Sequence, residues 1–198
     1  MKKHDTKTTR LRRTVEDIND SILRAAKEEI IENGFENTTI TDILKNANIQ
    51  ITVFHKRYND LYDLFDRLIR PYDYWFEDNL KFEGSNPTEK TINTLFHLID
   101  SLNNDPFMLQ ILLWEVSKDN YLTRRISAKR AQFFDYFIEK FFDKNITDIS
   151  ELNNISSFIV EGIIYFFLTR KRSNQLVSEN DIIILKNQVQ SIIISLSL

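Results

Sequence analysis

The chain of 198 residues is 42% hydrophobic and 28% charged, which is typical of a soluble globular protein with one sizeable core or two small ones. Its apolar stretches are too short for a membrane span and its N-terminus lacks the apolar core of a signal peptide, so we expect a cytoplasmic protein without membrane contact. The absence of cysteine excludes disulfides and thiolate chemistry, and His4, His55 and His97 have no ligand spacing, so we expect no metal and no cofactor.

Composition also indicates the fold class. The chain has only three glycines and three prolines, and its apolar residues recur at the 3.6-residue period of a helix. We therefore predict an all-α protein of about nine helices joined by short loops.

The formal net charge of −3 is unevenly distributed. Residues 1–13 hold six basic residues against Asp5 alone, a net charge of +5, whereas residues 71–198 hold 13 basic and 17 acidic residues, a net charge of −4. This asymmetry predicts a basic N-terminal arm, residues 1–14, that contacts nucleic acid, attached to a body that does not. A merely solubilising terminus is the alternative.

The first helix is predicted from about Val15 to Asn33. Gly34 then supplies a left-handed C-cap, because glycine adopts positive φ without strain. We expect Phe35 to fold back onto the core.

Two short helices follow at the spacing of a helix-turn-helix. Thr39 is a good N-cap for a helix from Ile40 to Lys45, and its amide-rich end suits a phosphate. Residues 46–48 form the predicted turn, and the next helix spans roughly Gln50 to Tyr58. Residues 15–60 are therefore predicted to be a DNA-binding domain that enters the major groove.

The helix predicted at 50–58 separates two faces, with Ile49, Phe54 and Tyr58 inward. An isoleucine beside threonine, histidine and lysine on the outer face suits a groove, where apolar groups meet thymine methyls and basic groups reach guanine or phosphate. A solvated face with one stray isoleucine is the alternative. The predicted DNA-binding residues are Thr39, Gln50, Ile51, Thr52, His55, Lys56 and Arg57.

Residues 15–65 resemble the DNA-binding domain of the TetR/AcrR family of transcriptional regulators. The matching positions are core, helix-end and turn residues, namely Ile22-Leu23, Ala25-Ala26, Gly34-Phe35, Thr38-Thr39, Ile43, Ala47, Ile49, Val53-Phe54, Tyr58 and Leu64. The resemblance implies a homodimer that binds a pseudo-palindromic operator in double-stranded DNA. It also implies that a small-molecule effector in the helical C-terminal domain releases the operator.

Several positions depart from that family on the DNA side. Asn48 replaces a turn glycine, Gln50 a capping serine, Thr52 a glycine and His55 a tyrosine, while Leu61 stands in place of a phosphate-binding lysine. We expect a less well capped recognition helix and the loss of one phosphate contact, which lowers the log–log salt slope by about one unit. A TetR-like helical interaction protein with weakened or lost specific DNA binding is therefore the alternative function.

Residues 61–198 are predicted to form a helical domain for effector binding and dimerisation. Its helices are expected at 61–82 with a bend near Pro71, at 87–102 and 106–117 after capping residues, at 121–142 and 151–169, and from the N-cap Ser178 to the C-terminus. The helix at 61–82 is expected to link the two domains mechanically.

The last two predicted helices are apolar around most of their girth and need cover on both sides. Burial within the monomer is one solution. We favour packing against the same helices of a twofold mate, because two such helices close the chain. The predicted interface residues are Phe158, Gly162, Ile163, Phe166, Val189 and Ile193.

Aromatic residues gather in the second domain. Core packing explains any single one of them, but with the resemblance some are expected to line an effector cavity. The candidate pocket residues are Trp75, His97, Trp114, Phe137 and Tyr165. Glu115 and Glu161 would favour a cationic ligand if they turned inward.

Catalytic motifs are absent from the sequence, which has no GxSxG, no phosphate-cradling glycine loop, no HExxH and no cysteine nucleophile. We therefore expect no enzyme. The favoured function is sequence-specific, DNA-binding transcription regulation by a repressor that a small molecule releases from a palindromic operator.

Overall fold

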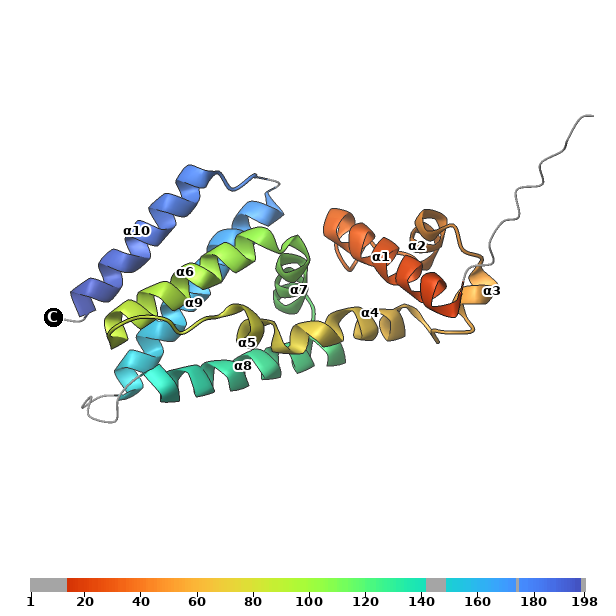
Figure 1. Ribbon diagram of the computed structural model, residues 1–198. Coiled ribbons are helices and arrows are strands. Elements are labelled where there is room, and N and C mark those ends of the chain that lie inside the picture. Colours follow the sequence, from red (N-terminus) through yellow and green to blue (C-terminus); the bar gives the residue numbers. More distant parts are fainter. Residues whose placement is uncertain (1–13, 142–148, 174, 197–198) are drawn as a thin grey trace, which may run out of the picture.

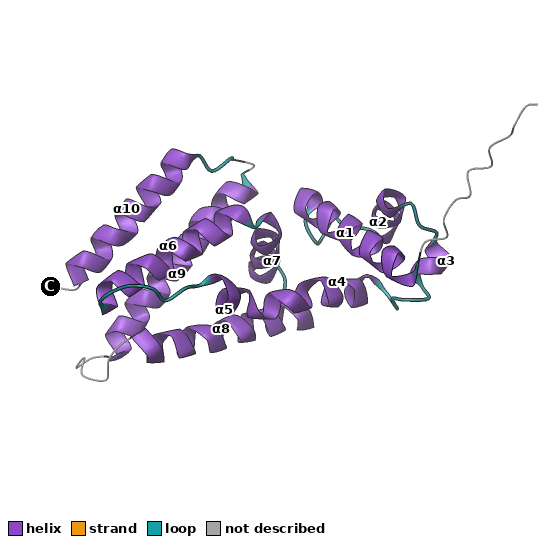
Figure 2. Ribbon diagram, in the orientation of Figure 1, coloured by secondary structure: helices purple, strands orange, loops and turns teal. Residues whose placement is uncertain are grey.

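The structure is a computed structural model that describes residues 14–141, 149–173 and 175–196, with backbone only for 134–141, 149–157 and 196. Within these ranges all regular structure is helical, which confirms the predicted fold class (Figure 2). No helix in the described part of the chain is long and apolar enough to cross a membrane. Except for Thr14, the predicted basic arm lies outside the described residues.

The chain begins with α1 (Val15–Asn33), α2 (Ile40–Ala47) and α3 (Ile51–Phe54). The Thr14 hydroxyl caps α1 by accepting from the Asp17 N–H at 3.1 Å, and the Asp17 carboxylate accepts from the Thr14 N–H at 2.9 Å. This reciprocal pair satisfies two otherwise free amides, and so fixes the start of α1.

Gly34 ends α1 at φ 79° and ψ 164°, and its N–H donates to the Ile30 carbonyl at 2.8 Å. The positive φ explains the glycine, but the ψ lies outside the left-handed helical region that the sequence predicted. Phe35 is buried, as expected, and its ring meets Phe65 edge-on and Trp114 face-on.

The predicted single helix from 61 to 82 was wrong in its length and continuity. The chain instead forms α4 (Leu61–Ile69), the 3-10 helix η1 (Arg70–Tyr74) and α5 (Trp75–Asn79). Pro71 has no N–H to donate to the preceding turn, and the bend predicted there takes the form of the tighter 3-10 segment. Leu80 is already extended, with φ −95° and ψ 119°.

Two capped helices follow, α6 (Pro87–Asn104) and α7 (Pro106–Ser117). The Asn86 side chain accepts from the Glu89 N–H at 2.9 Å, and the Asp105 carboxylate accepts from the Met108 N–H at 3.0 Å. Both predicted starts are therefore confirmed, because each pairs a capping oxygen with a proline that fits the first helical turn.

The last three helices are α8 (Tyr121–Phe141), α9 (Ile149–Arg172) and α10 (Glu179–Leu196). Ser178 caps α10 as predicted, with its hydroxyl accepting from the Asp181 N–H at 3.2 Å. These helices agree with the predicted ones to within a few residues at each end.

The small unit of α1, α2 and α3 lies at one end of the molecule, and α4 leads from it into the larger helical body (Figure 1). In that body α6 packs against both α9 and α10, while α7 contacts α8 and α9. The two parts also meet directly, because α1 packs against α7 and α4. The unit of α1, α2 and α3, called the recognition unit below, is thus attached to the larger helical body through both α4 and α7.

Candidate DNA-binding site

The unit that presents α3 is held together by a buried carboxylate as well as by its core. Glu29 of α1 is 8% exposed and accepts from Asn46 of α2 at 3.0 Å and from Asn33 at 2.7 Å. A buried carboxylate is stable only when such hydrogen bonds compensate its lost hydration. Glu29 therefore fixes α2 on α1, a role that the apolar pattern of the sequence did not indicate.

The turn between α2 and α3 is formed by Asn48, whose φ of 53° and ψ of 53° are left-handed. Asparagine tolerates this conformation, as expected from its replacement of glycine. Its N–H donates to the carbonyls at the end of α2, so the turn closes that helix.

The recognition helix is shorter than predicted. It spans Ile51–Phe54 and continues as a turn, in which the Tyr58 N–H still donates to the Phe54 carbonyl at 3.0 Å. Gln50 stands at the N-cap and makes no side-chain capping bond, as its replacement of serine predicted. A helix with an uncapped first turn and only four residues depends on tertiary contacts to hold its orientation.

The two faces of this segment are separated as predicted. Phe54 and Tyr58 are almost completely buried, whereas Ile51 is 48% exposed. The other exposed side chains around it are Gln50, Thr52, His55 and Lys56. The segment thus presents one apolar and several hydrogen-bonding side chains to the outside, the combination that reads base edges in a major groove.

Thr39 is exposed and caps α2, accepting from the Asp42 N–H at 3.2 Å. Its hydroxyl also donates to the Asp42 carboxylate at 2.6 Å, so its proton is already used. A phosphate at this helix end would therefore meet the backbone amides rather than the hydroxyl.

Arg57 is half-buried, and its Nη1 donates to the Val53 carbonyl at 3.1 Å. Its Nε is buried without a hydrogen-bond partner among the described residues. Lys56, in contrast, is exposed. Leu61, which stands where a phosphate-binding lysine was expected, packs partly buried against the core.

The predicted pocket residues differ in burial and in their partners where the structure describes their side chains. Trp75 is buried and donates from its indole N–H to Asp105 at 2.9 Å, while Trp114 is buried and donates to Glu36 at 3.0 Å. His97 is half-buried, and the side chain of Phe137 lies outside the described residues. Tyr165 is 69% exposed, so its expected place inside a cavity was wrong for this chain.

An open pocket of about 620 Å³ lies instead between α1 and the body. It is lined by Lys27 and Ile31 of α1 and by Asp100, Asp105 and Phe107 of the body, among others. Glu115 does turn inward, but it forms an ion pair with Arg130, while Glu161 is exposed. Neither carboxylate supports the predicted cationic ligand.

The predicted dimer residues divide into two groups. Phe158 is 76% exposed and Gly162 is open, whereas Ile163, Val189 and Ile193 are buried within the monomer. The second group was therefore wrongly placed at the surface, because these side chains are covered within the monomer, where α6 packs against both helices. Phe166 is half-buried and belongs to neither group.

Sequence reasoning also missed the residues that join α1 to the body. Gln110 donates to the Ile31 carbonyl at 2.9 Å and Lys171 donates to the same oxygen at 3.1 Å. Glu36 accepts from Trp114 and pairs with Lys118 at 2.7 Å. The one available signal was Gln110, a polar residue inside the otherwise apolar run of α7, since a buried amide needs a partner.

Residues 22–68 match the family model described as bacterial regulatory proteins, tetR family. The solved structures with the same fold include the fatty acid degradation regulator FadR from Bacillus halodurans, with a TM-score of 0.66 and 15% identity, covering 92% of this chain and 96% of that one. FadR from Bacillus subtilis in complex with stearoyl-CoA has a TM-score of 0.61 and 18% identity, covering 89% and 97%. A transcriptional regulator from Aquifex aeolicus VF5 has a TM-score of 0.63 and 20% identity, covering 88% and 96%. No curated protein matches the sequence.

The fold and the exposed segment at 51–58 define a helix-turn-helix unit of the kind that binds DNA. Residues 22–68 are therefore similar to the tetR family of bacterial regulatory proteins, in agreement with the resemblance seen in the sequence. The match covers the DNA-binding unit itself, and the shared fold extends over nearly the whole chain.

Proposed function

We propose that the protein is a homodimeric repressor that binds a palindromic operator and leaves it when a small molecule binds. The observation that carries this proposal is the outer face of α3, where exposed Ile51, Thr52, His55 and Lys56 project from a family-typical helix-turn-helix. We further propose that the protein acts in the cytoplasm, where its DNA lies, and that it has no enzymatic activity.

The homodimer is supported by an apolar face of α9, and by apolar side chains of α10, that the monomer leaves uncovered. On α9 this face contains Phe158, Gly162 and Tyr165, and α10 adds exposed isoleucines such as Ile183 and Ile184. A twofold axis through such a face would pair it with itself. The two recognition helices would then read half-sites separated by one or more helical turns of about 10 base pairs each.

Release by an effector is supported by the way the body holds the recognition unit. The pocket between α1 and the body is lined from both sides, so its occupation would alter their contact. The FadR of Bacillus subtilis was solved with stearoyl-CoA, and for this chain we propose a largely apolar small molecule. A coupling of about 1–3 kcal/mol is typical when two sites share one conformational equilibrium.

Selection of bound sequences from random duplex DNA, followed by titration over a salt series, tests the DNA-binding part. We expect a palindrome, weaker binding for Lys56→Ala by about fivefold, and an altered base preference for Ile51→Ala with similar total affinity. Equal affinity for selected and random duplexes at every salt concentration would instead favour the helical interaction protein, which Thr52, His55 and Leu61 keep as the second candidate.

A further inference from the structure

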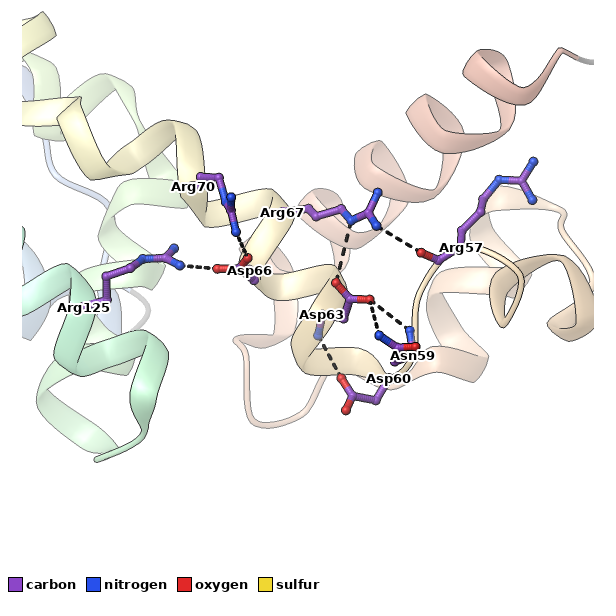
Figure 3. Close-up of polar contacts among 8 residues, drawn as sticks. All are labelled: Arg57, Asn59, Asp60, Asp63, Asp66, Arg67, Arg70 and Arg125. Atoms are coloured by element: carbon purple, nitrogen blue, oxygen red, sulfur yellow. Dashed lines mark hydrogen bonds and ion pairs between the residues drawn. The ribbon is translucent and has the colours of Figure 1, made fainter.

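The turn that follows α3, residues 55–60, is held by two side chains of α4 (Figure 3). This contact matters because α3 itself is only four residues long and lacks a side-chain cap. Buried Phe54 and Tyr58 anchor its inner side. The remaining freedom of the segment lies in the turn that joins it to α4.

Arg67 makes three contacts with this turn and its surroundings. Its Nη2 donates to the Arg57 carbonyl at 3.2 Å, and its Nε lies 3.7 Å from the Asp63 carboxylate. Its guanidinium carbon lies 4.9 Å from the centre of the Tyr58 ring. A planar guanidinium can serve a carbonyl, a carboxylate and an aromatic face together, which a lysine ammonium cannot do in the same geometry.

Asp63 completes the arrangement from the preceding turn of α4. Its carboxylate accepts from the Asn59 backbone N–H at 3.0 Å and from the Asn59 side chain at 3.2 Å. The Asp63 N–H donates to the capping carboxylate of Asp60 at 2.8 Å. Arg67 and Asp63 therefore tie the backbone at Arg57 and Asn59 to one rigid helix.

Arg67 is placed to act on the turn rather than on DNA. Six residues separate it from Leu61, the position expected to face phosphate, so it lies about 9 Å further along the helix axis. Its guanidinium is directed at the Arg57 carbonyl, whereas the Arg57 side chain extends away from that contact (Figure 3).

We propose that Arg67 is a positioning residue, which fixes the turn at 55–60 and thereby sets DNA affinity without contacting DNA. The inference rests on the proposed DNA binding, but the positioning itself can be measured in the free protein. Arg70, the C-cap of α4 and the first residue of η1, provides a matched control, because it is exposed and pairs with Asp66, which also bonds Arg125 of α8. Asp66 lies on α4 and Arg125 on α8, so neither residue belongs to the turn at 55–60.

The experiment compares Arg67→Lys, Arg67→Met, Arg70→Lys and Arg70→Met in the full chain. Three quantities are measured for each variant. The affinity for the selected duplex is measured over a salt series, and the rate of amide hydrogen exchange at Asn59 is measured in the free protein. Thermal unfolding checks that each variant keeps the fold. For Arg67→Lys we expect an affinity loss of about fivefold to tenfold with an unchanged salt slope, because the charge remains and the hydrogen-bond geometry is lost. Asn59 should exchange faster, and both Arg70 variants should stay within about twofold of wild type.

A direct phosphate contact would give a different result: Arg67→Lys would keep the wild-type affinity, and only Arg67→Met would lower the salt slope, by about 0.9. That result would overturn the proposal. Unchanged exchange at Asn59 in both Arg67 variants would overturn it as well. If the wild-type chain selected no duplex, the proposed function would fail, and the exchange measurement would still decide whether Arg67 holds the turn.

Discussion

Among single residues, Glu36 connects the recognition unit to the body through two side-chain contacts. Its carboxylate accepts from the Trp114 indole and pairs with Lys118, next to the stacked rings of Phe35 and Trp114, whose centroids lie 4.2 Å apart. The hydrogen bond from Lys118 holds the pKa of Glu36 below its ordinary value of 4.5. Glu36 therefore keeps its charge, and this contact, into mildly acidic solution.

Acidification should loosen this junction. Because the pKa of Glu36 is lowered in the folded protein, its contribution to stability is present above 4.5 and disappears as the pH falls through the lowered folded value. We expect the emission of Trp114, measured in a Trp75→Phe background, to shift below pH 4.5 in the chain with Glu36. Glu36→Gln should give the low-pH spectrum already at pH 7. Identical pH profiles with and without the carboxylate would show that Glu36 does not hold the indole.

At the scale of helices, the first residue of a helix could be predicted from local hydrogen bonding. The contacts between helices depend on long-range packing and could not be predicted. Thr39, Asn86, Asp105 and Ser178 were predicted as N-caps because each bond reaches only three residues along the chain. The family resemblance and the outward face of α3 also followed from local spacing. The contact between Gln110 and the Ile31 carbonyl spans 79 residues, and no periodic pattern encodes it.

The same limit explains the mixed outcome for α9 and α10. Both helices are apolar on most sides, so their sequences could not show which side α6 would cover. The structure places Ile163 and Ile193 on the covered side and Phe158 and Ile184 on the open side. The predicted interface therefore has to be tested at the open residues.

Charged substitutions should separate the two sides. Phe158→Glu combined with Ile184→Glu should give a monomer that keeps wild-type helicity, because only the proposed dimer contact is lost. Ile163→Asp should unfold the chain instead, since an unpaired buried charge costs several kcal/mol. Sedimentation and circular dichroism distinguish these results. A wild-type monomer at micromolar concentration would contradict the dimer.

Across the whole molecule, net charge is distributed so that the unit of α1, α2 and α3 is itself acidic, which opposes binding to a polyanion such as DNA. Residues 15–60 hold five basic and nine acidic residues, a net charge of −4, and residues 71–198 carry another −4. The compensating charge of +5 lies in residues 1–13. Long-range attraction to DNA should therefore come mainly from the arm, while the face of α3 supplies base contacts.

Deletion of residues 2–13 should consequently weaken all duplexes alike and flatten the salt dependence. Each phosphate contact contributes about 0.9 to the log–log slope, so the loss of two to four contacts should lower it by roughly 2–4 units. The selected palindrome should stay preferred over random DNA by the same ratio, because the residues that read bases are retained. Ile51→Ala should do the opposite: it should alter the ratio of affinities for the palindrome and random DNA and leave the salt slope unchanged.

An arm of identical composition in scrambled order should restore the salt slope, since counterion release depends on the number of charges rather than their sequence. If the deleted chain kept the wild-type slope, the arm would be only a solubilising terminus, and the phosphate contacts would have to come from Lys56 and the helix ends.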